Sequence, residues 1–255
     1  MPGTEAMRAR TMDPQRIARA FGVWFLLTWV FAIAGRALLS PAYSDPEYIL
    51  GAGSGVGVQL GAVFDFLLII ANIATAVVLY PIAKRYSQIG ALGYVTARIM
   101  ESAFIMVGIL SLVSIVALRQ DVSGSTGADA AALEATGRSL ATVYEFAFLF
   151  GPGLVVGVGN GLILGWLMYS SGLVPRRLAM LGLIAGPCLI VGFILVFFGM
   201  VETDSAGQFV FSLPEMVWEA ALPIYAIWKG FRPAAIASGE PRQVGADPAF
   251  SATSA

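Results

Sequence analysis

Several residues that can carry charge or form hydrogen bonds stand inside long apolar stretches of this sequence. They are Asp65, Asn72, Arg98, Glu101, Glu145, Asn160, Glu215 and Glu219. Arg98 and Glu101 are three residues apart, so on a helix they share a face and can form an ion pair. Glu215 and Glu219 are four residues apart, and two carboxylates on one helix face repel unless a cation lies between them or one holds a proton. The chemistry to expect is ion pairing, or binding of protons, cations or a polar solute.

An ionised side chain at the centre of a bilayer costs about 2.5–3.5 kcal/mol, so such residues usually face the inside of a helix bundle and find partners. Two interpretations follow. In the structural one, Arg98 pairs with an acid, and the network fixes how the second, third and sixth apolar segments pack. The acids to consider are Asp65, Glu101 and Glu219. In the functional one, the buried polar residues, Asn72 among them, form a proton or cation route or line a polar cavity for a small solute.

The composition excludes the catalytic mechanisms and metal sites that need histidine or several cysteines. The chain has no histidine, so Ser-His-Asp triads, HExxH zinc sites and histidine-ligated haem are excluded. Its one cysteine, Cys188, permits neither an internal disulfide nor a cysteine-rich metal cluster. With a net charge of −1 and no catalytic motif, we expect no enzyme activity, no cofactor, no metal ion and no nucleic-acid partner.

The elements that must position these residues are transmembrane helices. Hydrophobic residues make up 58% of the 255 residues and charged residues 12%, whereas soluble domains carry about 25% charged residues. A span needs about 20 mostly apolar residues, and the segments that qualify are 17–39, 58–82, 92–118, 143–169, 178–200 and 209–228. We therefore predict an all-α, polytopic membrane protein with a six-helix bundle over residues 17–231. An N-terminal segment, 1–16, precedes the bundle and a disordered tail, 232–255, follows it.

The basic residues are divided unevenly between the two sides of this bundle. Eleven lysines and arginines flank the spans on the side of the N-terminus, and three, Arg36, Arg119 and Arg138, flank them on the other side. Cytoplasmic loops carry the excess of basic residues, so both termini are expected in the cytoplasm. One alternative is that the first segment is a signal peptide with a cleavage site at Ala32-Ile33-Ala34, which would leave five spans.

Glycines recur at helical spacing in the fourth and fifth predicted spans. The positions are Gly153, Gly157, Gly161 and Gly165, then Gly182 and Gly186. Lipid gives helices little hydrophobic reason to associate, so a smooth stripe of small residues lets two backbones pack closely. The glycine stripe predicts a helix–helix seam within the chain or, alternatively, the face of a homodimer.

Five segments together resemble one family of bacterial membrane proteins, domain of unknown function 4386. They are ARAFGVWFLL at 18–27, LYPIAKRYSQIGALGYVTARIMES at 79–102, YSSGLVPRRLAMLGLIAG at 169–186, FFGM at 197–200 and PEMVWEAALPIYAIWKGF at 214–231. The Arg98–Glu101 pair, the LVPRR turn and the last segment are the most specific parts. The resemblance implies an integral protein of the bacterial cytoplasmic membrane and brings no established activity with it.

These features together indicate an integral membrane protein with a buried charged core and no assigned molecular activity. One hypothesis is a small-solute or proton-coupled transporter that uses the charged residues Asp65, Arg98, Glu101, Glu215 and Glu219. The other is a membrane interaction or stress-response subunit that works through the glycine stripe. The expected partners are the lipid bilayer, with a homo-oligomer as an option, and a small-molecule ligand that the sequence does not identify.

Overall fold

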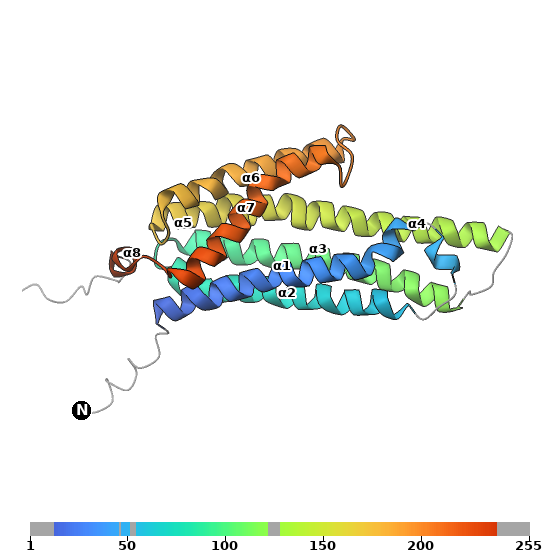
Figure 1. Ribbon diagram of the computed structural model, residues 1–255, viewed down its shortest axis with the longest axis horizontal. Helices are drawn as coiled ribbons and strands as arrows, with labels where there is room; N and C mark the ends of the chain where they lie inside the picture. The colour runs from blue at the N-terminus through green and yellow to red at the C-terminus, as the bar shows by residue number, and fades with distance from the viewer. Residues whose placement is uncertain (1–12, 46, 52–54, 122–127, 239–255) are drawn as a thin grey trace, which may run out of the picture.

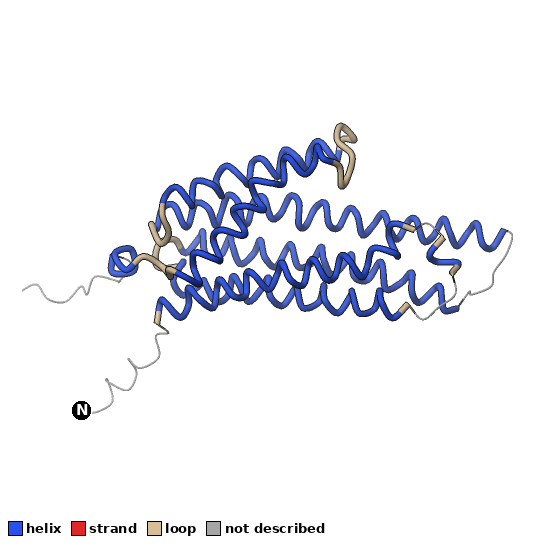
Figure 2. Tube along the Cα trace, in the orientation of Figure 1, coloured by secondary structure: helices blue, strands red, loops and turns tan. Residues whose placement is uncertain are grey.

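The computed structural model describes residues 13–45, 47–51, 55–121 and 128–238. Helices and short loops make up the whole described trace (Figure 2). Within it, six helices are long and apolar enough to cross a membrane: Pro14–Ser44, Val56–Ala83, Gln88–Gln120, Asp129–Ser171, Arg176–Phe197 and Ala206–Trp228. The predicted all-α, six-helix membrane fold is confirmed.

The helices run back and forth along one bundle axis (Figure 1). In chain order, the first half contains α1 (Pro14–Ser44), the 3-10 turn η2 (Tyr48–Leu50), α2 (Val56–Ala83) and α3 (Gln88–Asp121). The fourth span is composite and contains α4 (Ala128–Phe148), η3 (Leu149–Val155), η4 (Gly157–Leu164) and α5 (Gly165–Ser171). A hairpin of α6 (Arg176–Phe197) and α7 (Ala206–Trp228) follows, and the short helix α8 (Pro233–Ser238) ends the described chain.

The neighbours of each helix set the shape of the bundle. Helix α1 packs against α2 and α7, α3 lies between α2 and the fourth span, and α6 packs against α7 and η4. The start of α1 and the helix α8 lie at the same end of the bundle (Figure 1). The tail predicted for 232–255 thus begins with α8, and residues 239–255, like residues 1–12, lie outside the described part of the chain.

The fourth span departs from α-helical geometry over much of its length. Leu149–Val155 and Gly157–Leu164 are π-helical. Pro152 has no N–H to donate, so it interrupts the regular hydrogen-bond ladder, and five glycines between residues 151 and 161 leave the backbone conformationally permissive. Short π-helical turns are frequent at functional sites, and this wide segment lines the site described below.

Apolar side chains fill the bundle in three clusters along its length. The cluster near the chain ends includes Phe21, Tyr94 and Trp218. A second cluster, around Tyr144, lies at the opposite end, and a smaller one surrounds Ile105 in α3. Large apolar side chains also cover much of the outside of the bundle, as expected of a surface solvated by lipid.

Candidate functional site

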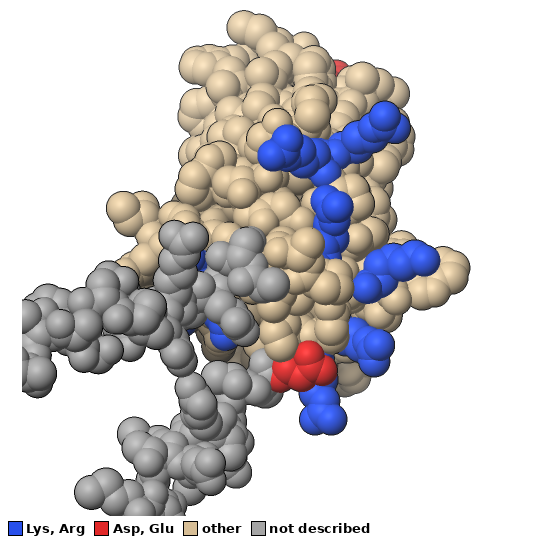
Figure 3. All heavy atoms as spheres, turned by 90° about the vertical axis from the view of Figure 1, so that its left-hand side faces the viewer, with Lys and Arg blue, Asp and Glu red and all other residues tan. Residues whose placement is uncertain are grey.

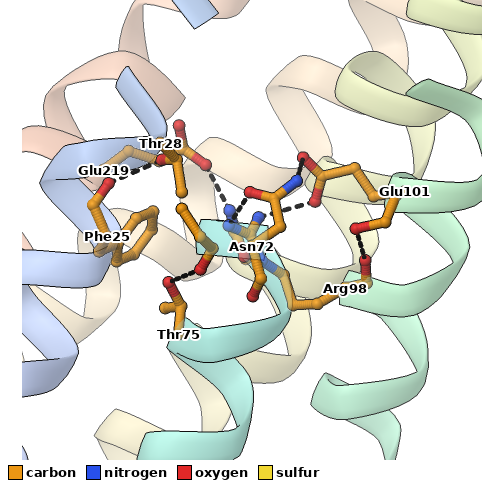
Figure 4. Close-up of polar contacts among 10 residues, drawn as sticks. Phe25, Thr28, Asn72, Thr75, Arg98, Glu101 and Glu219 are labelled. Carbon is orange, nitrogen blue, oxygen red and sulfur yellow. Dashed lines mark hydrogen bonds and ion pairs between the residues drawn. The ribbon is translucent and has the colours of Figure 1, made fainter. Parts of the chain in front are cut away.

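Three buried polar side chains of α2 and α3 form a closed ring of hydrogen bonds (Figure 4). Nη1 of Arg98 donates to Oε2 of Glu101 at 2.7 Å, and Nη2 of Arg98 donates to Oδ1 of Asn72 at 2.6 Å. Nδ2 of Asn72 donates to Oε1 of Glu101 at 3.0 Å. Arg98 is 2% exposed and Glu101 is 5% exposed. Among the acids considered for Arg98 from the sequence, Glu101 is the ion-pair partner.

The polar ring, as we call these three residues, is held by further contacts. The spacing of Arg98 and Glu101 places them on one face of α3. Nε of Arg98 lies 3.5 Å from the backbone carbonyl oxygen of Asn72, and its guanidinium carbon lies 5.6 Å from the ring centroid of Phe25 on α1. A buried ion pair needs such additional bonds, because the desolvation of two charges can exceed their Coulombic attraction. The ion pair of Arg98 and Glu101 carries no net charge, and its guanidinium and carboxylate groups are both hydrogen-bonded.

Glu219 on α7 does not pair with Arg98 as Glu101 does, and its hydrogen bonds come from uncharged side chains. Nδ2 of Asn160 on η4 donates to Oε1 of Glu219. Nε1 of Trp218 donates to the backbone carbonyl oxygen of Asn160 at 3.0 Å, which ties α7 to the π-helical segment. The amide of Asn160 carries no charge, so within the described residues Glu219 forms no ion pair.

A cavity of about 290 Å³, which we call the central cavity, lies between the polar ring and Glu219. It is lined by Thr28, Trp29, Ala32, Ile33, Leu68, Asn72, Arg98, Glu101, Phe148, Pro152, Val156, Met216 and Glu219. These residues come from α1, α2, α3, the fourth span and α7, so the cavity lies among the helices of the bundle. An apolar wall with a few convergent polar groups is typical of a small-molecule site.

A second cavity of about 180 Å³, the outer cavity, lies toward the end of the bundle opposite α8. Its wall includes Arg36 and Asp204, and Nη2 of Arg36 lies 2.6 Å from Oδ2 of Asp204. The guanidinium carbon of Arg36 also lies 5.8 Å from the ring centroid of Phe148. Phe148 and Pro152 line both cavities, so the two cavities adjoin at this wall.

Two predicted site residues are buried away from the central cavity. Asp65 on α2 is 0% exposed, and a Cβ on Gly35 of α1 would overlap its Oδ1. Glu215 on α7 is 3% exposed, and its Oε2 lies 3.0 Å from the position that a Cβ on Gly161 would occupy. In the described part of the chain, neither carboxyl group has a hydrogen-bond partner. Glu145, by contrast, is exposed and lines the outer cavity.

The structure therefore gathers only part of the predicted polar set. The residues that it brings to the central cavity are Asn72, Arg98, Glu101 and Glu219. Asp65 and Glu215 do not line this cavity. Sequence reasoning missed Phe148, because an aromatic residue in an apolar segment carries no distinguishing signal. It also missed the pair of Arg36 and Asp204, which are 168 residues apart.

The glycine stripe of the fourth span packs against α6 of the same chain. A Cβ on Gly161 would overlap Cα of Gly186. A Cβ on Gly157 would lie 3.0 Å from the carbonyl oxygen of Gly186, and one on Gly165 would lie 3.2 Å from the carbonyl carbon of Gly182. Helix α6 therefore covers this part of the stripe, which is not open to a second copy of the chain.

Gly153 and Gly182 have other surroundings. A Cβ on Gly153 would make an ordinary contact at 3.8 Å with the ring of Phe193. A Cβ on Gly182 would lie 2.6 Å from the indole of Trp218. The absence of a side chain at Gly182 thus makes room for the indole that bonds to Asn160.

Six helices that are long and apolar enough to cross a membrane, with buried charged and amide side chains between them, define this chain as a multi-pass membrane protein. The family described as Domain of unknown function (DUF4386) matches residues 20–230. The chain belongs to this family, as its five similar segments indicate. No curated protein and no solved structure matches it.

Proposed function

We propose that this protein is a membrane carrier that binds a small amphipathic amine in the central cavity. The observation that carries the proposal is the position of Glu219. This acid lines the cavity and, among the described residues, is hydrogen-bonded to two uncharged side chains, those of Asn160 and Trp29, and forms no ion pair with a cation.

The charge of the cavity wall favours a cationic ligand. Nη1 of Arg98 lies 2.7 Å from Oε2 of Glu101, so the charges of these two side chains cancel. An ionised Glu219 then gives the cavity wall a net charge of −1. An ammonium group would supply the missing positive charge and hydrogen-bond donors. Trp29 is part of the same wall, and the face of an indole ring attracts ammonium groups.

The size and the apolar part of the cavity restrict the ligand further. A volume of about 290 Å³ is close to the lower end of the ligand-pocket range of about 300–1,000 Å³. Ile33, Leu68 and Val156 offer apolar surface to the rest of the ligand. A short alkyl chain with an amino group fits both requirements.

The wall between the two cavities supports a transport role over simple storage of a ligand. Phe148 and Pro152 stand between the outer cavity and the central cavity, and Pro152 belongs to the π-helical segment η3. Short π-helical segments within membrane-spanning helices are frequent at functional sites. A rotation of Phe148 away from this wall would join the cavities.

The cavity wall and the glycine stripe also bear on whether the protein is an enzyme or an interaction subunit. The cavity wall holds charged, amide and hydroxyl groups without a histidine or cysteine nucleophile pair, so we propose a non-enzymatic role. The interaction-subunit hypothesis depended on the glycine stripe, which α6 covers over Gly157, Gly161 and Gly165. A homo-oligomer would have to use another face.

We also infer that the end of the bundle with α8 faces the cytoplasm of a bacterial cell. Exposed basic side chains gather at this end (Figure 3). They are Arg16, Arg19, Lys84, Arg85, Arg176, Arg177, Lys229 and Arg232. This distribution supports cytoplasmic termini, and a C-terminal alkaline phosphatase fusion should be inactive. An active fusion would reverse the orientation.

Thermal stability in mild detergent tests the ligand class. Butylamine and tetraethylammonium should raise the melting temperature of the wild-type protein, because a ligand that binds only the folded state stabilises it. Butyrate and butanol, matched to butylamine in chain length, should not. Glu219→Gln should abolish the increase, whereas Glu145→Gln, at an exposed acid, should retain it. Equal stabilisation of Glu219→Gln, or stabilisation by butyrate, would contradict the proposal.

A further inference from the structure

A second acid of α7, Glu215, is buried without any hydrogen-bond partner among the described residues. Its side chain is one helical turn from Glu219 but does not line the central cavity. It lies at the close crossing of η4 and α6, where Oε2 is 3.0 Å from the position of a Cβ on Gly161. The residue is 3% exposed, and both of its carboxyl oxygens lack a donor.

The groups that face Glu215 do not neutralise it. The ionisable residues that interact with it electrostatically are Glu219 on α7, Arg98 and Tyr94 on α3, and Cys188 on α6. The one cation of this set, Arg98, donates its hydrogen bonds to Asn72 and Glu101.

A second unsatisfied acceptor lies in the same layer of the bundle. Asn160, which precedes Gly161 in η4, is 0% exposed, and its Oδ1 has no donor in the described part of the chain. Its Nδ2 already donates a hydrogen bond to Oε1 of Glu219. The region where Glu215 of α7 meets η4 and α6 therefore holds more acceptor oxygens than donors, and buried acceptors without donors are costly. One additional proton would supply a donor and remove a negative charge at once.

The packing favours a proton over a metal ion at this place. A Cβ on Gly161 would already lie 2.7 Å from the backbone nitrogen of Gly186, so the helices leave little space beside the carboxyl group. A metal ion such as Ca²⁺ needs about 6–8 oxygen ligands around it. Within the described residues, no group of three or more histidine, cysteine or acidic side chains is arranged to hold a metal ion.

We propose that Glu215 is a proton-binding residue, which holds a proton while Glu219 is ionised and exchanges that proton with Glu219. In the exchange, the O–H bond of Glu215 breaks as an O–H bond on Glu219 forms, which leaves Glu215 negative and Glu219 neutral. The two residues are four apart on α7, a spacing that places them on the same face of a helix, and their carboxyl groups interact electrostatically. Because Glu219 lines the central cavity, it connects the buried proton with that cavity.

The exchange would couple proton movement to the amine. A neutral Glu219 no longer attracts an ammonium group, so a proton that reaches Glu219 displaces the amine, and proton and amine move in opposite directions. This coupling rests on the proposed function. The proton site does not, because it depends only on the surroundings of Glu215.

Infrared spectroscopy of the full chain in lipid nanodiscs, without added amine, tests the proton site separately from amine binding. At neutral pH, the wild-type protein should show the carbonyl stretch of a protonated carboxylic acid. Labelling glutamate with heavy carbon at its carboxyl group should shift this band, which distinguishes it from any contribution of Asp65. The shifted band should be lost in Glu215→Gln and retained in Glu219→Gln and in Glu145→Gln.

Three results would overturn the proposal. They are the absence of a label-sensitive band in the wild type, survival of the band in a folded Glu215→Gln variant, and loss of the band when sodium chloride is added to a buffer that contains neither metal salts nor amines. If Glu215→Gln does not fold, the variants Glu101→Gln and Glu219→Gln show whether either of the other buried glutamates is the source of the band. A band that persists in both variants supports Glu215 as its source, and loss of the band in either one contradicts that assignment.

Discussion

Asn72 of α2 closes the ion pair of α3 by accepting a hydrogen bond from Nη2 of Arg98 at 2.6 Å. The other end of the same amide donates to Glu101 at 3.0 Å. The carbonyl oxygen of Asn72 thus faces the cation and its amino group faces the anion, so the amide matches the dipole of the pair. This arrangement joins α2 to α3 and holds the side chain of Arg98 in the wall of the central cavity.

Replacement of Asn72 by leucine should destabilise the bundle. The change removes one acceptor from Arg98 and one donor from Glu101, and unsatisfied buried polar groups cost about 1–3 kcal/mol. Unfolding in mild detergent should show a loss of this size relative to Ile73→Leu, a volume-conserving change on the same helix. A loss no larger than that of Ile73→Leu would mean that the bonds of Asn72 contribute little.

Removal of one partner of the Arg98–Glu101 pair should cost more than removal of both. Arg98→Met leaves Glu101 buried and unpaired, which we expect to lower the free energy of unfolding by about 3–5 kcal/mol. The double variant Arg98→Met with Glu101→Met should recover much of this loss, because no uncompensated charge remains. A double-mutant cycle measures the difference, and additive losses would show that the two side chains act independently.

The glycine stripe offers a matched pair of substitutions. Gly161→Ala would place a Cβ on Gly186 of α6, and overpacking costs about 1–3 kcal/mol. Gly153→Ala, in the same stripe, would contact Phe193 at 3.8 Å and should be tolerated. Melting temperatures of the two variants in one detergent compare them directly. Equal melting temperatures would contradict the close crossing of η4 and α6.

The ion pair of Arg36 and Asp204 should restrict access to the cavities while contributing little stability. Asp204 is exposed, and exposed ion pairs contribute about 0–1 kcal/mol. In a Cys188→Ser background with Thr28→Cys in the central cavity, Asp204→Ala should increase the rate of labelling by a charged thiol reagent.

The control for this experiment is Glu134→Ala, which breaks the exposed pair of Glu134 with Arg138 on α4. That variant should label at the rate of the background protein. Identical rates for Asp204→Ala and Glu134→Ala would argue that the pair of Arg36 and Asp204 does not control entry to the central cavity.

The sequence was sufficient to predict the membrane spans and part of the site. Apolar runs long enough to cross a bilayer have few alternative structures, because backbone polar groups in lipid must be satisfied within the helix. Arg98 and Glu101 belong to one helix and are three residues apart, so their pairing follows from local geometry.

The rest of the site depends on how the helices cross. The separate burial of Asp65 follows from the close approach of Gly35, which lies on another helix. Spacing placed Glu215 and Glu219 on one face of a helix, but it did not predict that the carboxyl group of Glu215 packs at Gly161 while Glu219 reaches the cavity. The π-helical geometry of the fourth span also carried no sequence signal beyond glycine and proline content, which is common in membrane helices.

Equilibrium binding of radiolabelled butylamine to the purified protein in lipid nanodiscs would show whether the central cavity holds an amine at Glu219. We expect saturable binding to the wild type and to Glu145→Gln, with competition by unlabelled butylamine but not by butyrate. A folded Glu219→Gln variant should show no saturable binding. Saturable binding that is unchanged in Glu219→Gln, or the absence of saturable binding to the wild type, would contradict a central cavity built to hold an amine.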